Sequence, residues 1–179
     1  GGSSMDVAKV VAVLLGSQQT LSELYGVDQV TGGRLPLILV PTTAGTGSEV
    51  TPVAVITTGE TTKAGVSSPV LLPDVAVLDA SLTLGLPASI TAMTGVDAMV
   101  HAIEAYTSRH KKNPLSDNLA VKALALLSRN IRTAVHEGGN REARENMLLG
   151  ACLAGQAFAN APVGAVHALA YPLGGHYHI

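Results

Sequence analysis

Apolar and polar positions in the first half of the chain follow two different periods. Residues 6–16, DVAKVVAVLLG, place their apolar side chains at a helical spacing and carry an acid, Asp6, where a helix is expected to begin. Continuous apolar runs follow at residues 35–40, 50–57 and 73–79, and their length and β-branched content predict buried strands. Pro52 argues against a central position for the second strand. Such runs are typical of sheets covered on both faces, so this half is predicted to be α/β.

The pattern becomes helical from about Pro87 onwards. Residues 94–108 fit a helix, and so do residues 141–160, whose many Ala and Gly residues predict close packing against other helices. Residues 117–136 have the clearest helical period, with large apolar side chains on one broad face: Leu119, Leu124, Leu127, Ile131 and Val135. This half is therefore predicted to be all-α.

A last helix is expected to begin near Val163 and to end at Pro172. The composition shifts at residues 84–90, where the strand pattern stops. We therefore predict a domain boundary that divides the chain into residues 1–86 and residues 87–179.

Composition excludes several classes of function. The chain has 179 residues, of which 47% are hydrophobic and 13% charged, so it can bury a sizeable core and disorder is disfavoured. A net charge of −2 and an aromatic content of 3% argue against binding to nucleic acid. No apolar run has the length of a membrane span, so a membrane is not an expected partner either. The lone Cys152 excludes a disulfide framework and suits a cytoplasmic location.

Both ends of the sequence predict that it is an excerpt of a longer chain. It opens on GGSSMD, without an initiator Met or a signal-peptide pattern, and closes on GGHYHI. A residual cloning tag is the alternative interpretation of GGSS. If the excerpt interpretation holds, we expect this chain by itself to be a poor enzyme.

Two small-residue turns are candidates for binding phosphate. GGSSMDVAK feeds a helix N-terminus, whose backbone amides and dipole attract anions. PTTAGTGSEVT, residues 41–51, follows a predicted strand at the position where open α/β sheets bind nucleotides. Neither turn has the Walker or the GxGxxG pattern, and simple helix capping or a hydroxyl-rich loop remains the alternative for each.

Asp97 and His101 are four positions apart in a predicted helix, so their side chains share one face. His167 lies in another apolar helical stretch. A carboxylate with imidazoles suits Fe²⁺, Zn²⁺ or Mn²⁺. A capped helix with a buried ion pair is the alternative that the spacing leaves open.

GGSSMDVAK, PTTAGTGSEVT, GVDAMVHAIEAY and NAPVGAVHALAYPLGG, in this order, resemble the motifs of the iron-dependent (group III) alcohol dehydrogenases. The resemblance extends over essentially the whole chain but covers only the middle of the family's length. It implies a dehydroquinate-synthase-like architecture. Residues 1–86 would be an incomplete Rossmann-like dinucleotide-binding α/β domain, and residues 87–179 an incomplete all-α metal-binding, catalytic domain.

The resemblance also implies a metal site. The family holds a divalent metal, commonly iron, between one aspartate and three histidines, and Asp97, His101 and His167 match the first three of these ligands. The last ligand belongs to a PHG-type motif on which neither His176 nor His178 falls. We expect Fe²⁺ or Zn²⁺ here.

The cofactor implied by the resemblance is NAD, with NADP not excluded. The residues that match the family's cofactor-binding positions are Gly1, Gly2 and Ser3 in the pyrophosphate turn, Thr42, Thr43 and Thr46 in the second loop, and Lys63. Tyr171 stands where many relatives carry a second histidine on the proton path, so it is a candidate catalytic residue.

The implied activity is reversible hydride transfer between a primary alcohol or aldehyde and NAD(P), with the metal as a Lewis acid. Relatives that act on lactaldehyde, a diol, a hydroxy acid or maleylacetate are the alternatives within the family. A different alternative is an incomplete fragment that binds cofactor or metal and catalyses nothing. Exposed sheet edges and apolar helix faces predict a homo-oligomer.

Overall fold

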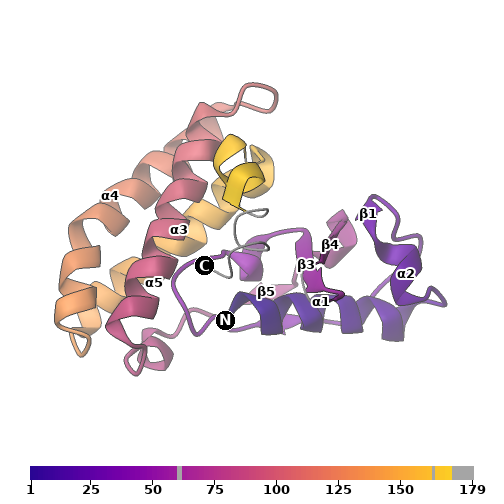
Figure 1. Ribbon diagram of the computed structural model, residues 1–179, viewed down its shortest axis with the longest axis horizontal. Coiled ribbons are helices and arrows are strands. Elements are labelled where there is room, and N and C mark those ends of the chain that lie inside the picture. The colour runs from indigo at the N-terminus through magenta and orange to yellow at the C-terminus, as the bar shows by residue number, and fades with distance from the viewer. Residues whose placement is uncertain (60–61, 163, 171–179) are drawn as a thin grey trace.

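The computed structural model of the protein describes residues 1–59, 62–162 and 164–170. They form an α/β part and a bundle of helices, which lie side by side (Figure 1). The long helices are α1 (Gly2–Gly16), α3 (Ala88–Thr107), α4 (Pro114–His136) and α5 (Arg141–Asn160), with a short α2 (Leu21–Leu24). The strands are β1 (Gly26–Val27), β2 (Ile38–Leu39), β3 (Val53–Thr57), β4 (Lys63–Ser67) and β5 (Val75–Ala76).

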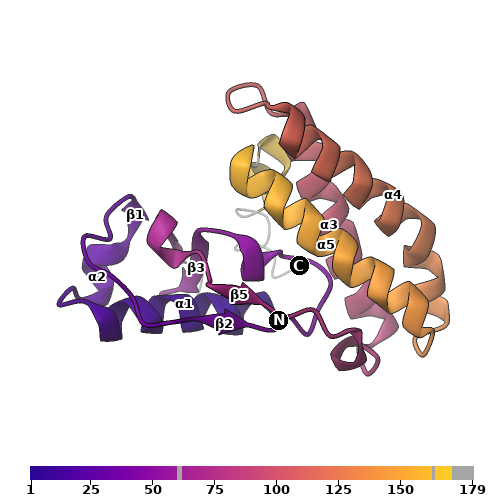
Figure 2. The ribbon, with the colours of Figure 1, turned by 180° about the vertical axis from the view of Figure 1, so that it is seen from behind.

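Helix α1 lies at the centre of the α/β part, with apolar side chains on two of its faces. Val13 on one face packs with Val66 of the three-stranded sheet, whose strand order is β1-β4-β3. Ala12 packs with Leu39 of β2, and β2 pairs in parallel with β5. Figure 2 shows β2 and β5 running alongside α1. The first turn of α1 is thereby directed at the helical bundle, near the N label in both views.

The α/β part agrees with the sequence pattern in its order but not in all its bounds. Each predicted strand is present but shorter, and β3 is an edge strand, as Pro52 suggested. The helix predicted from Asp6 begins at Gly2, so Asp6 lies inside the helix and does not cap it. Strand β4 was missed because KAGVS has little β-branched content, yet it pairs antiparallel with β3 and parallel with β1.

The expectation that the sheets are covered on both faces is wrong for β2 and β5. Ile38 is 63% exposed, although its neighbour Leu39 is 4% exposed. Successive side chains in a strand point to opposite faces, so Leu39 faces α1 while Ile38 points outward. Val75, its partner in β5, is likewise 46% exposed. In this chain the apolar runs of β2 and β5 therefore belong to strands that are covered on one face only.

Helices α3, α4 and α5 pack through small residues, as the Ala and Gly content predicted. Their core consists mostly of alanines, with Leu127 and Met147 among the large members. A Cβ added at Gly150 of α5 would lie 2.8 Å from Cγ of Leu127 on α4, so the two helices are in close contact there. The helices predicted at residues 117–136 and 141–160 are confirmed.

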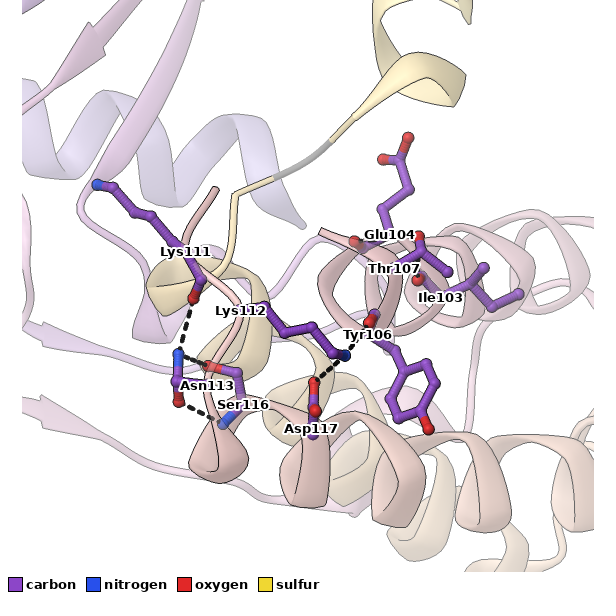
Figure 3. Close-up of polar contacts among 9 residues, drawn as sticks. All are labelled: Ile103, Glu104, Tyr106, Thr107, Lys111, Lys112, Asn113, Ser116 and Asp117. Carbon is purple, nitrogen blue, oxygen red and sulfur yellow. Dashed lines mark hydrogen bonds and ion pairs between the residues drawn. The ribbon is translucent and has the colours of Figure 1, made fainter. Parts of the chain in front are cut away.

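A polar cluster closes the turn between α3 and α4 (Figure 3). Lys112 Nζ donates to the Tyr106 carbonyl at 2.6 Å and to the Asp117 carboxylate at 2.8 Å, and it lies 4.3 Å from the centre of the Tyr106 ring. Asn113 caps α4 by accepting from the Ser116 amide at 2.9 Å. The direction in which α3 ends is therefore fixed by contacts with the start of α4.

Residues 165–170 are helical, as part of the last predicted helix. Its predicted first and last residues, Val163 and Pro172, lie outside the described residues. The all-α pattern begins at Ala88, the first residue of α3, while the domain boundary at residues 86 and 87 stays a prediction. Among the described residues, no helix combines the length and the apolar character needed to cross a membrane.

Candidate active site

The loop at residues 41–51 follows β2 and packs against two helices of the bundle. Gly47 adopts a left-handed conformation with φ of 63°, which glycine tolerates without a steric penalty. A Cβ added at Gly47 would lie 2.6 Å from Cα of Gly155 on α5, and one added at Gly45 would lie 2.8 Å from Cβ of Thr94 on α3. The loop can touch both helices because side chains are missing at these positions.

The same loop is tied to α1 by buried polar contacts. Asp6 accepts from the Ser48 hydroxyl at 2.5 Å and from the Val55 amide at 3.0 Å. Lys9, which is 0% exposed, donates to the carbonyl of Thr51 at 2.8 Å, to its hydroxyl at 3.2 Å and to the Val53 carbonyl at 2.8 Å. Burial lowers the pKa of Lys9 to about 8, against the opposing effect of the nearby carboxylates. One turn of α1 thus holds both the loop and the first residues of β3.

The side chains of Asp97, His101 and His167 converge on one point. Each offers one ligand atom, and these atoms all lie within 4.8 Å of one another. Asp97 Oδ1 is 3.9 Å from His101 Nε2 and 3.5 Å from His167 Nε2. Metal–donor bonds of about 2.0–2.2 Å place two donors of one ion at most about 4 Å apart, so small side-chain movements would suffice. A carboxylate with two imidazoles is a donor set that suits Fe²⁺ or Zn²⁺.

The two imidazole rings are held in different ways. The His101 ring stacks between Phe158 at 4.6 Å and the His167 ring at 4.5 Å. Its Nδ1 is buried and has no hydrogen-bond partner among the described residues. Burial lowers the pKa of His101, which favours the neutral ring that a metal requires. Asp97 raises the pKa of His167 by accepting a hydrogen bond from the charged ring, and Glu104 adds to this effect.

A cavity of about 670 Å³ lies between the α/β part and the bundle. Its wall includes residues from both sets that the sequence singled out: Gly2, Ser3, Thr46, Lys63, Asp97, His101 and His167. Lys111, from the turn between α3 and α4, also reaches the wall. The candidate phosphate turns and the candidate metal ligands therefore face one cavity.

The remaining candidates lie elsewhere. Gly1, Thr42 and Thr43 do not line the cavity; the Gly1 nitrogen donates to the Thr42 hydroxyl at 3.0 Å, and Thr43 lies beside Gly1. These three residues lie where the two turns contact each other. Tyr171, with His176 and His178, falls outside the described residues.

Sequence reasoning missed three polar residues around this site. Asp6 has the sequence position of a helix-starting acid, and nothing in the pattern marks Lys9, because a lysine on an otherwise apolar helix is usually exposed. Glu104 is 5% exposed and contacts His167 Nδ1 at 2.5 Å. Its signal was present, since Asp97, His101 and Glu104 follow the helical spacing of one face.

Comparison with known proteins shows which family the chain is similar to. A family described as "Iron-containing alcohol dehydrogenase" matches residues 1–80, and one described as "Fe-containing alcohol dehydrogenase family, C-terminal" matches residues 91–179. Long-chain-alcohol dehydrogenase 1 of Geobacillus thermodenitrificans is 50% identical over 100% of this chain and 46% of its own length. The chain thus spans about half the length of the curated relatives it matches.

Solved structures show the same similarity. An alcohol dehydrogenase from Oenococcus oeni superposes with a TM-score of 0.95 at 40% identity, over 100% of this chain and 47% of that one. A sulfoacetaldehyde reductase from Bifidobacterium kashiwanohense, solved in complex with NAD⁺, has a TM-score of 0.91 at 38% identity, over 100% of this chain and 48% of its own. These neighbours confirm the predicted fold, an incomplete Rossmann-like part followed by a helical part. The chain belongs to the iron-containing alcohol dehydrogenase family.

Proposed function

We propose that this chain forms the cofactor and metal cleft of an NAD(P)-dependent alcohol dehydrogenase. The reaction is reversible hydride transfer between a primary alcohol or its aldehyde and the nicotinamide. The observation that carries the proposal is the shared cavity, in which the turn at Gly2 and Ser3 faces the same space as Asp97, His101 and His167. Hydride transfer needs the cofactor and the substrate oxygen to be held at reacting distance, and one cavity serves both.

Each group of residues has a separate task in this proposal. Asp97, His101 and His167 hold a divalent metal, which supplies Lewis-acid polarisation of the substrate oxygen. The amides of Gly2 and Ser3, at the start of α1, bind the cofactor pyrophosphate, with Thr46 beside them. Phe158 and the apolar wall restrict water around the reacting atoms.

Lys63 and Lys111 lie on the wall of the same cavity and contribute positive charge for an anionic cofactor. Tyr171 is proposed to pass the proton, because a phenol both donates and accepts hydrogen bonds. Gly1, Thr42 and Thr43 support the two phosphate turns through their mutual contacts.

Further proposals concern the whole protein. We propose NAD as the cofactor, NADP being the alternative that the titration below distinguishes. The exposed apolar positions of β2 and β5 support a homo-oligomer, and the lone, buried Cys152 suits a cytoplasmic location. The division into residues 1–86 and 87–179 is proposed as the cofactor part and the metal part.

The substrate class rests on the relatives. One is named for long-chain alcohols and another for sulfoacetaldehyde, so the metal cleft is compatible with different primary alcohols and aldehydes. Turnover with propanol, 1,3-propanediol, lactaldehyde and a hydroxy acid would rank these alternatives.

The experiment combines binding and turnover. Metal uptake is measured after anaerobic addition of Fe²⁺ or Zn²⁺, and cofactor binding is measured by fluorescence titration with NADH and NADPH. Alcohol oxidation is then followed with the chain and with any longer natural protein that contains it. Metal and cofactor binding without turnover in either protein would favour the alternative of a binding remnant. Absence of metal uptake would contradict the proposal.

A further inference from the structure

Glu104 is a buried carboxylate that joins two elements of the metal site. It lies on α3, three positions after His101, and is 5% exposed. Its Oε2 is 2.5 Å from His167 Nδ1, while its Oε1 accepts from the Val166 amide at 2.7 Å. Figure 3 shows the side chain leaving α3 on the side away from the Lys112–Asp117 pair, towards the ribbon of residues 164–170.

The two contacts have different chemical consequences. The Val166 amide belongs to the first turn of the helical residues 165–170, so Glu104 caps that segment from α3. The contact with His167 assigns the ring protons, because an ionised carboxylate only accepts hydrogen bonds. Both ring nitrogens face a carboxylate, but Nδ1 is 2.5 Å from Glu104 whereas Nε2 is 3.5 Å from Asp97. When the ring is neutral, its one proton therefore stays on Nδ1 and its lone pair is on Nε2. That atom lies 3.5 Å from Asp97 Oδ1, on the side of the proposed metal.

Only one of the two histidines has such an arrangement. His101 sits within a long helix and is stacked between two rings, while its Nδ1 has no partner among the described residues. His167 is carried by a short helical segment whose amide end is bonded to Glu104. Orientation of His167 consequently depends on a side chain of another element.

We propose that Glu104 is a positioning residue that fixes the tautomer of His167 and holds residues 164–167 against α3. The metal half of this inference rests on the proposed function. Hydrogen-bond partners of this kind typically change metal affinity about 10–100-fold when they are replaced. The effect of Glu104 on the tautomer of His167 is expected in the metal-free chain as well. The tautomer and the metal affinity can therefore be tested separately.

The test uses Glu104→Gln, which keeps the size of the side chain. The amide oxygen must face the Val166 amide, since the amide nitrogen would oppose another donor there. The amide nitrogen then donates to Nδ1, which places the ring proton on Nε2 and removes the lone pair that a metal needs. Glu104→Asp retains a carboxylate and should restore part of the effect. Glu142→Gln, at an exposed position on α5, is the matched control.

The first readout is the ring ¹⁵N spectrum of His167 in the metal-free chain. It is recorded at a pH high enough for the ¹⁵N shifts to show a neutral ring, because the neighbouring carboxylates raise the pKa of His167. Signals are assigned by their loss in His167→Gln. We expect Nδ1–H in the wild type, in Glu142→Gln and in Glu104→Asp, and Nε2–H in Glu104→Gln. An Nε2–H ring in the wild type overturns the inference, even if Glu104→Gln does not fold.

The second readout is Zn²⁺ affinity by competition with a chelator. We expect Glu104→Gln to bind about 10–100-fold more weakly than wild type, with Glu104→Asp in between and Glu142→Gln unchanged. In the His167→Gln background the same replacement should have no further effect. Wild-type affinity in a folded Glu104→Gln variant overturns the positioning role. Failure of the wild type to bind Zn²⁺ while showing the Nδ1–H ring contradicts the proposed function and leaves the role of Glu104 in the tautomer intact.

Discussion

Gly155 on α5 and Gly47 in the loop at residues 41–51 meet backbone to backbone. A Cβ added at Gly155 would lie 2.8 Å from Cα of Gly47 and 2.9 Å from a methyl carbon of Val50. Alanine at a helical position is ordinarily favourable by about 1 kcal/mol over glycine. Here the forced separation of two backbones would outweigh that gain, because overpacking costs about 1–3 kcal/mol.

We therefore expect Gly155→Ala to lower the free energy of unfolding by up to about 2 kcal/mol and to weaken NADH binding. Urea denaturation and fluorescence titration measure the two effects. Gly139→Ala is the control, since nothing lies within 4 Å of a Cβ at that position. A Gly155→Ala variant that is more stable than wild type would show that the loop can move away freely.

Replacement of Lys9 should destabilise the chain and change its response to alkali. Lys9→Met removes hydrogen bonds to Thr51 and Val53 and leaves buried carbonyls unpaired, which costs about 1–3 kcal/mol for each group. The pKa of Lys9 falls from 10.5 in the unfolded chain to about 8 in the folded one. Between these values the unfolded state binds more protons, so Lys9 makes stability rise with pH.

The measurement is denaturant unfolding at intervals across this pH window. Lys9→Met should be less stable at every pH. Its free energy of unfolding should also rise less steeply with pH than that of the wild type, because the contribution of Lys9 is missing. Lys122→Met, on the exposed face of α4, should follow the wild type. Equal slopes in wild type and Lys9→Met would mean that Lys9 stays protonated throughout.

The ion pair of Arg34 with Asp74 should make β2 and β5 sensitive to acid. Two oxygens of Asp74 accept from Arg34, at 2.7 and 2.9 Å, and one also accepts from the Leu37 amide at 2.7 Å. Hydrogen bonds from Arg34, and then from Leu37, lower the pKa of Asp74 from 3.8 to about 2. The contribution of Asp74 to folding stability is therefore complete above pH 3.8, its unfolded-state pKa. It is lost as the pH falls towards about 2, its pKa in the folded chain.

Thermal unfolding between pH about 5 and about 2 tests this pair. Asp74→Asn should be less stable than wild type at the upper end, and the difference should shrink as the pH falls. Asp28→Asn is the matched control, at an exposed carboxylate that has no ion pair with any described residue. If the stabilities of wild type and Asp74→Asn changed in parallel with pH, the lowered pKa of Asp74 would be contradicted.

Loss of His101 should lower metal occupancy. His101→Ala removes a proposed ligand whose Nε2 lies 3.9 Å from Asp97 Oδ1, so affinity should fall more than about tenfold. Equilibrium dialysis followed by metal analysis measures it. His110→Ala, exposed in the turn between α3 and α4, should bind as wild type does. Unchanged metal content in His101→Ala would remove the metal site from the proposed function.

Periodicity and spacing predicted those features that depend on neighbours in sequence. The helices at residues 117–136 and 141–160 have a regular apolar face, and Asp97 with His101 share a face because they are one helical turn apart. The approach of His167 depends on packing between elements, so the sequence offered it only as a candidate on another helix, and the family resemblance matched it to a ligand position. Strand β4 forms because β3 supplies a pairing partner, which no local pattern of KAGVS reveals.

Burial of polar groups was the hardest feature to predict. Lys9 has the same position in the helical period whether it points to solvent or to Thr51, and only the return of the chain at residues 51–53 decides between them. Glu104 is different. Its spacing from His101 could be read from the sequence, but its contact with His167 could not.

The contact between Gly47 and Gly155 joins positions about 100 residues apart, and this has a consequence for the order of folding. Closing so long a segment costs conformational entropy before any contact repays it. We infer that the loop at residues 41–51 acquires its final shape only after α5 has been synthesised and docked, whereas α1 and the β3–β4 hairpin can form earlier. Pulsed hydrogen exchange during refolding would show the Val50 and Thr51 amides gaining protection no sooner than those of α5. A nascent chain that ends before α5 would then lack a formed cofactor cradle and could not be stabilised by cofactor during its synthesis.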